Sequence, residues 1–198
     1  MGFSQYDNLP RKFSDFLIAQ VAAKVAEKVE QNIWQGATAN AGEFDGFQAL
    51  LAADSDVVDV SGTTLSAANI IAELGKVVDA IPSGVYNKED LKIYIPTSAA
   101  KFYIQAQAAL GYRELYNVGK TEMNFQGIEL FTASGLGANK IVAAESSNLF
   151  FGTGLLNDWQ EVKLIDMADI DGSQNVRVVL RGSAGVQHGI GSDIVLYS

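Results

Sequence analysis

Hydrophobic residues recur every four positions near the start of the chain, which predicts a long amphipathic helix over residues 14–34. The stripe comprises Leu17, Val21, Val25, Val29 and Ile33. Ser14 is placed to cap the start of the helix, and Gly36 follows its last turn. We expect Val25 to be buried, so that Val25→Asp would cost on the order of 3 kcal/mol or more.

After this helix the pattern becomes mixed and then changes to a period of two. Helices are predicted over residues 66–80, capped by Ser66, and over residues 99–110, with a buried strand at 91–95 between them. Further strands are predicted at 128–132, 140–144, 161–166 and 176–181, with Asp171-Gly172-Ser173 as a hairpin turn, and on either side of Gly191-Ser192. With no βαβ alternation and no internal repeat, this order predicts the α+β class.

The composition limits the function classes. The chain has 198 residues, of which 48% are hydrophobic, enough for the core of one large domain or two small ones. The formal charge of −9 repels phosphate backbones, so we expect no sequence-specific nucleic-acid binding. Cysteine is absent, which excludes disulfides and thiolate chemistry. No apolar run approaches the roughly 20 residues of a membrane span, so no membrane partner is expected.

Motifs for phosphate and dinucleotide binding are incomplete. The segment YNVGKT ends like a phosphate-binding loop, but a glutamate stands where the first glycine is required. Three Gly-X-Gly triplets, at 135–137, 152–154 and 189–191, lack the third glycine of a dinucleotide fingerprint and are interpreted as turns. The sequence therefore predicts no cofactor.

Candidate metal ligands and catalytic residues are equally isolated. Carboxylates at 54–59 and near 169–171 begin like calcium loops but lack the later ligands, so both clusters are interpreted as solvated turns. His188 is the only histidine, and Ser183 and Ser192 lie outside any nucleophile-elbow pattern. We interpret His188 as an ordinary strand histidine, and we predict no metal site, no catalytic residue and no enzyme activity.

Several phrases, taken in order, resemble the C-terminal part of a tailed-phage major capsid protein. They are EQNIWQG, FDGF, KIYIPTSAAKFYIQAQAALG, GIELFTASGLGANKIVAAESSNLFFGT and NVRVVLRGSAGVQHGIGSDIVLY. The resemblance covers nearly the whole chain and rests on order and spacing. Family members normally carry an N-terminal arm and an extended loop before the first long helix. Here only residues 1–13 precede it, so we expect both elements, and any cross-linking through that loop, to be lacking.

The resemblance implies a domain arrangement. Residues 1–36 would form a peripheral domain with a spine helix, residues 37–158 an axial domain, and residues 159–198 strands that return to the peripheral domain. The small residues after Gly36 and the Phe44–Phe47 turn would lead from the spine helix into the axial domain. This accounts for the abrupt end of the helical pattern.

The implied function is a structural subunit of a phage or prophage capsid shell, which self-assembles into hexamers and pentamers around the genome. Its partners would be copies of itself, with scaffolding and portal proteins as further candidates, in a virion capsid assembled in the bacterial host cytoplasm. Two alternatives stay open. One is an encapsulin-like nanocompartment shell protein, and the other is a small enzyme or ligand-binding domain with an unrecognised site.

Assembly contacts are expected just after the helix at 99–110, because this segment points toward the symmetry axis of the capsomer in the resembled family. It carries Tyr112, Arg113, Tyr116 and Lys120. Interfaces are enriched in tyrosine and arginine, so we expect these four residues to contact neighbouring subunits. The alternative is that the aromatic residues cover the axial domain's own core.

Overall fold

The structure, a computed structural model, describes residues 13–111, 123–154, 162–167, 172, 176–180 and 182–198. The chain divides into two compact units. The smaller unit comprises Met1–Val29 and Thr153–Ala184, and the larger unit comprises Glu30–Gly152 and Gly185–Ser198. Among the described helices, none combines the length and the apolar character that a bilayer span requires.

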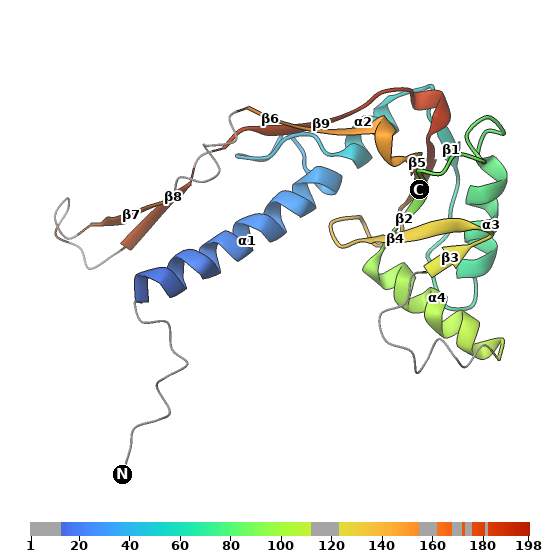
Figure 1. Ribbon diagram of the computed structural model, residues 1–198, viewed down its shortest axis with the longest axis horizontal. Helices are drawn as coiled ribbons and strands as arrows, with labels where there is room; N and C mark the ends of the chain where they lie inside the picture. Colours follow the sequence, from blue (N-terminus) through green and yellow to red (C-terminus); the bar gives the residue numbers. More distant parts are fainter. Residues whose placement is uncertain (1–12, 112–122, 155–161, 168–171, 173–175, 181) are drawn as a thin grey trace, which may run out of the picture. The chain divides into compact units, whose positions relative to one another are not determined.

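The elements follow the predicted order of helices, then mixed structure, then strands (Figure 1). They are α1 (Phe13–Gln35), α2 (Phe47–Ala53), β1 (Val58–Val60), α3 (Ile70–Ala80), β2 (Leu91–Pro96), α4 (Thr97–Ala109), β3 (Met123–Phe125), β4 (Ile128–Ala133), β5 (Ile141–Glu145), the 3₁₀ turn η1 (Ser146–Asn148), β6 (Leu149–Thr153), β7 (Val162–Asp166), β8 (Val176–Leu180), β9 (Ala184–His188), the 3₁₀ turn η3 (Gly191–Asp193) and β10 (Val195–Tyr197).

Two local differences from the sequence prediction have clear causes. Helix α3 begins at Ile70 and not at Ser66, because Ser66 and Asn69 close a separate turn. Asn69 Oδ1 accepts the backbone N–H of Ser66 at 2.7 Å and its hydroxyl at 3.0 Å. Helix α2 and strand β1 were not predicted, since they have only seven and three residues, and elements this short show no clear periodic pattern in the sequence.

The larger unit is built on a six-stranded mixed sheet with the order β1-β10-β5-β2-β4-β3. Strands β2 and β4 are parallel, with Ile93 opposite Leu130, and α4 lies between them in the chain. The expectation of no βαβ connection was therefore wrong at this one place. A long segment that includes β3 separates α4 from β4, so the order of elements in the sequence does not alternate strand, helix, strand here. Strand β1 is likewise parallel to β10. The pairs β10–β5, β5–β2 and β3–β4 are antiparallel, and the class is α+β.

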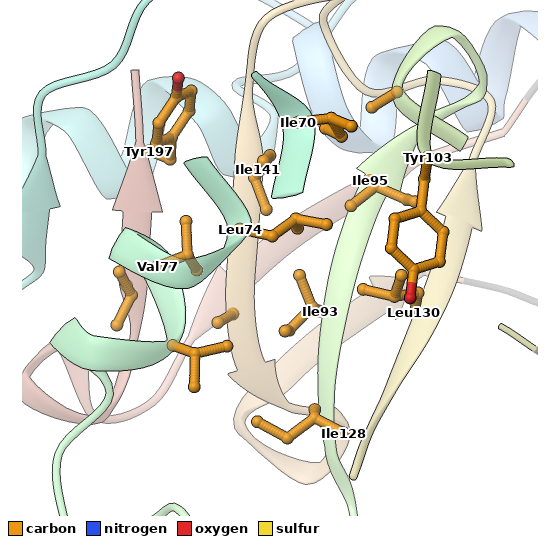
Figure 2. Close-up of a cluster of buried hydrophobic side chains, with 14 of the residues drawn as sticks. Ile70, Leu74, Val77, Ile93, Ile95, Tyr103, Ile128, Leu130, Ile141 and Tyr197 are labelled. Carbon is orange, nitrogen blue, oxygen red and sulfur yellow. The ribbon is translucent and has the colours of Figure 1, made fainter. Parts of the chain in front are cut away.

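One face of this sheet packs against α3 and α4 (Figure 1). Figure 2 shows Leu74 and Val77 of α3 on the side of Ile93, and Tyr103 of α4 beside Leu130, all in one cluster. Within one strand the core residues of this cluster are two positions apart, as Ile93 and Ile95 are, and within α3 they are three or four apart, as Leu74 and Val77 are. Their side chains therefore form one continuous apolar core.

The opposite face of the sheet carries a second core. Tyr94, Val142 and Leu196 point to this side, where they pack with Phe47 and Leu51 of α2. Because the sheet is covered on both faces, β5 is buried at every position from Ile141 to Glu145. An alternating pattern could not have been expected for such a strand.

The end of α1 enters this second core through Trp34. The indole ring lies 5.5 Å from the ring of Phe47 and 5.2 Å from that of Tyr94, measured between centroids. The loop that follows is closed at its neck, where the Gly46 N–H donates to the Gly36 carbonyl at 2.9 Å. The helical pattern breaks at Gly36 because the chain must turn back on itself there and lead into α2.

The smaller unit contains the first part of α1 and the strands β7 and β8. The two strands pair antiparallel, with Leu164 opposite Val178. Gly172 between them has a φ of +73°, as the predicted hairpin turn requires, while Asp171 and Ser173 lie outside the described residues. Val25 is half-buried and its neighbour Ala26 is exposed, so the expectation that Val25 is buried was wrong. Val21 and Val29 are half-buried as well and the residues between the three valines are exposed, so the position of the stripe was predicted correctly although Val25 is not buried.

The two units divide the C-terminal segment differently from the implied domains. Residues 159–198 were expected to return together to the peripheral domain, but Gly185–Ser198 groups with the larger unit. The reason is that β10 is inserted between β1 and β5 in the six-stranded sheet. The peripheral and axial assignment itself stays a prediction.

Candidate assembly surface

The four residues predicted for assembly, Tyr112, Arg113, Tyr116 and Lys120, lie outside the described residues. The described chain before them ends with Leu110, which is 65% exposed, and Gly111, whose φ of +93° ends the helical path. Their role at a subunit interface therefore stays a prediction.

His188 is not isolated as the sequence suggested. Its Nε2 lies 2.7 Å from Asp54 Oδ2, and its side chain is 7% exposed. The other carboxylate oxygen of Asp54 accepts the Asp56 N–H at 3.0 Å. Asp54 thus begins a turn, as predicted, and its side chain is 30% exposed, but its carboxylate also contacts His188, which was not predicted. The two partners are 134 positions apart in sequence, and no local pattern connects them.

The pair does not have the geometry of a serine hydrolase relay. In such a relay one ring nitrogen faces the carboxylate and the other faces the nucleophile. Here Nε2 faces Asp54, and Nδ1 is buried with no hydrogen-bond partner among the described residues. Within the part of the chain that is described, no three histidine, aspartate or glutamate side chains gather as a metal site would require. The pair therefore joins the end of β9 to the end of α2.

The pair should make stability depend on acid pH. The hydrogen bond with His188, followed by that from the Asp56 N–H, holds the pKa of Asp54 below its usual range. The ionised Asp54 carboxylate makes its full contribution to the free energy of unfolding above the pKa that Asp54 has in the unfolded chain, about 4. This contribution is lost as the pH falls through the lower pKa that Asp54 has in the folded protein. We expect melting temperatures recorded through the acid range to fall more steeply for the wild type than for Asp54→Asn. Asp59→Asn, an exposed residue of the same segment, should follow the wild type, and equal slopes for all three proteins would contradict this role.

Exposed apolar side chains gather where β6 and β9 pair. Phe150, Phe151 and Ile190 are 54%, 50% and 58% exposed, respectively. Strands β6 and β9 form a two-stranded sheet. Adjacent residues of a strand point to opposite faces, so Phe150 and Phe151 leave apolar surface on both sides of this ribbon. Exposed apolar surface of this kind is typical of a protein interface.

A shallow cavity of about 250 Å³ lies beside Phe150 and Ile190. Its wall also contains Lys88 and Glu145, whose Nζ and Oε1 atoms are 2.5 Å apart, and the carboxylate of Asp193. The Glu145 hydrogen bond, with smaller contributions from Asp193 and Asp90, raises the pKa of Lys88. The cavity and the exposed side chains of Phe150 and Ile190 thus form one surface, which we call the ribbon surface: Lys88, Glu145, Asn148, Phe150, Ile190 and Asp193.

No sequence pattern predicted the ribbon surface. Gly189-Ile190-Gly191 was interpreted only as a turn, and Phe150 only as part of a capsid-like phrase. Two signals were present. Adjacent phenylalanines in a strand cannot both face one core, and an isoleucine between two glycines has no neighbouring side chains to cover it.

No family model and no curated protein sequence matches this chain. Solved structures do. The capsid of a native GTA particle is similar with a TM-score of 0.67 and 13% identity, over 97% of this chain and 67% of that one. A chain of Mycobacterium phage Che8 is similar with a TM-score of 0.60 and 10% identity, over 100% of this chain and 67% of that one. The asymmetric unit of the cyanophage A-1(L) capsid is similar with a TM-score of 0.60 and 13% identity, over 94% of this chain and 69% of that one.

These similarities extend over both units of the chain, although the identities are low. The chain spans about two thirds of the length of each of the three structures. At such identities the likeness concerns the fold and not the chemistry. The chain has the α+β fold found in tailed-phage capsids.

Proposed function

We propose that this chain is a structural subunit of a phage or prophage capsid shell. The observation that carries the proposal is a fold shared with capsid structures over 94% or more of the chain. A shell needs no catalytic group and no cofactor. It is held by many small contacts that repeat with the symmetry of the particle.

In this proposal the subunit binds copies of itself in hexamers and pentamers, with scaffolding and portal proteins as further partners. The larger unit corresponds to the axial domain. The smaller unit corresponds to the peripheral domain, with α1 as the spine helix. The shell forms in the cytoplasm of a bacterial host and becomes the virion capsid.

Electron microscopy of the complete gene product, expressed alone and with the products of its neighbouring genes, tests the proposal. We expect closed shells with icosahedral symmetry. Shells that copurify with a folded enzyme and without DNA would indicate a nanocompartment instead of a capsid. A protein that stays monomeric under every combination would contradict the shell function.

The segment after α4 provides a sharper test. We propose that Tyr112, Arg113, Tyr116 and Lys120 contact neighbouring subunits around the capsomer axis. Arg113→Glu with Lys120→Glu would then crowd like charges at the axis. We expect a folded subunit with an unchanged melting temperature that forms no capsomers by size-exclusion chromatography with light scattering.

The matched control is Lys24→Glu with Lys28→Glu, which changes the net charge equally but lies on exposed positions of α1. This control should form capsomers. Normal capsomers from the Arg113 and Lys120 double variant would contradict an interface at these residues. Loss of capsomers in both double variants would indicate a general effect of the added negative charge.

A further inference from the structure

We propose that the ribbon surface is a docking site for a second copy of this chain, which inserts a basic side chain and a neighbouring apolar group. The inference rests on the proposed shell function. It adds a particular surface and the chemistry of the group that binds there.

The apolar part of the ribbon surface is held in place before any partner binds. Asn148 Oδ1 accepts the backbone N–H groups of Gly189 and Ile190 at 3.2 and 2.8 Å, and its Nδ2 donates to the Ile190 carbonyl at 2.8 Å. A Cβ at Gly189 would lie 3.3 Å from the ring of Phe150, so this ring packs closely on the turn. Ile190 and Phe150 are therefore exposed on a fixed backbone, and little entropy is lost when a partner covers them.

The charges of the cavity favour a cation. The wall contains one ammonium group, that of Lys88, and two carboxylates, those of Glu145 and Asp193. Glu145 is already paired with Lys88 in the wall of the cavity and is 8% exposed. Asp193 forms no direct ion pair with a described residue and interacts with Lys88 only through a smaller charge effect, so its half-buried carboxylate can still accept a cation from outside. A lysine or arginine beside an apolar residue would match both halves of the surface.

A second copy of the chain can supply such a group. A shell built from identical chains uses contacts in which one surface binds a different surface of its neighbour. Lys101 of α4 and Arg177 of β8 are exposed, and neither forms an ion pair within the described part of the chain. The chain carries 14 basic residues against 23 acidic ones, so a site selective for a cation has few possible partners on the neighbour.

The first experiment uses the absence of cysteine from the chain, because a single Ile190→Cys substitution creates a unique thiol. Its rate of reaction with a maleimide is measured in assembled particles and again after dissociation of the same particles. We expect assembly to slow the reaction by about tenfold or more, since interface cores exclude water and reagents. Equal rates in the two states would overturn the proposal.

A cross-linker attached to the same thiol identifies the occupant. Cleavage and mass spectrometry of assembled particles should reveal a peptide of this chain that contains lysine or arginine, joined between two copies. Mixed particles of isotopically labelled and unlabelled subunits separate links between copies from links within one copy. Links only within one copy, or only to another protein, would overturn the proposal.

The second experiment compares two matched variants. Ile190→Ser removes apolar area from the ribbon surface, and Phe131→Ser does so at an exposed position of β4, where Phe131 is 45% exposed. We expect the concentration needed for assembly to rise about tenfold or more for Ile190→Ser and to change little for Phe131→Ser. Asp193→Asn should raise it as well and weaken its dependence on salt.

The outcomes separate this inference from the shell function. If the wild type forms no particles, the shell function fails. If the wild type forms particles and Ile190→Ser assembles at the same concentration, the ribbon surface is not an interface and the shell function stands. An equal effect of Phe131→Ser would indicate a general loss of apolar surface and would also overturn the assignment.

Discussion

Replacing Trp34 by alanine should destabilise the larger unit by about 3–5 kcal/mol, the usual cost of removing a buried aromatic side chain. Trp34 is 6% exposed, and its ring contacts those of Phe47 and Tyr94. These contacts join α1, α2 and the sheet, and the cavity left by the indole cannot be filled by one neighbour. The measurement is the free energy of unfolding from denaturant titrations, followed by tyrosine fluorescence and circular dichroism.

The control is Phe16→Ala on the same helix. Phe16 is 49% exposed, so its replacement should change the free energy of unfolding by less than about 1 kcal/mol. A similar loss for both variants would mean that helix propensity and not the core contact decides the effect. An unchanged stability for Trp34→Ala would contradict the second core.

Trp34 also shows where reasoning from the sequence succeeds and where it ends. The period of four predicted α1 and its stripe, because a helix that covers one surface must repeat its apolar residues at that spacing. The period does not indicate which residue carries most of the packing. Trp34 is more buried than Val25 because the last turns of α1 lie on α2 and the sheet, an arrangement set by distant parts of the chain.

The other features that the sequence did not predict depend on contacts between residues far apart in the chain. The pairing of His188 with Asp54 and the parallel pairing of β2 with β4 both depend on the assembled sheet. The resemblance predicted the fold because it carries information about the whole order of elements. It indicated nothing about the ribbon surface, whose residues come from the segment after α3, the end of β5, η1, β6, the turn after β9 and η3.

Gly46→Ala should destabilise the larger unit by about 3 kcal/mol, at the upper end of the usual cost of overpacking. The backbone of Gly46 has a φ of −81° and a ψ of 170°, which alanine adopts without strain. The cost is therefore steric. A Cβ would lie 2.6 Å from the Asn32 carbonyl oxygen, 2.7 Å from the Trp34 carbonyl carbon and 2.8 Å from the Gly36 nitrogen. All three atoms belong to the backbone and cannot move without opening the neck of the loop.

Opening the neck would also displace α2, since the Gly46 carbonyl accepts the N–H groups of Ala49 and Leu50 in its first turn. The matched control is Gly75→Ala in α3, where a Cβ would meet no atom within 4 Å. Alanine in a helix interior should stabilise the protein by about 0.5–1 kcal/mol. The same chemical change should thus give effects of opposite sign in denaturant titrations. If Gly46→Ala is neutral, Gly36 and Gly46 do not approach closely, and the break in the helical pattern after Trp34 needs another explanation.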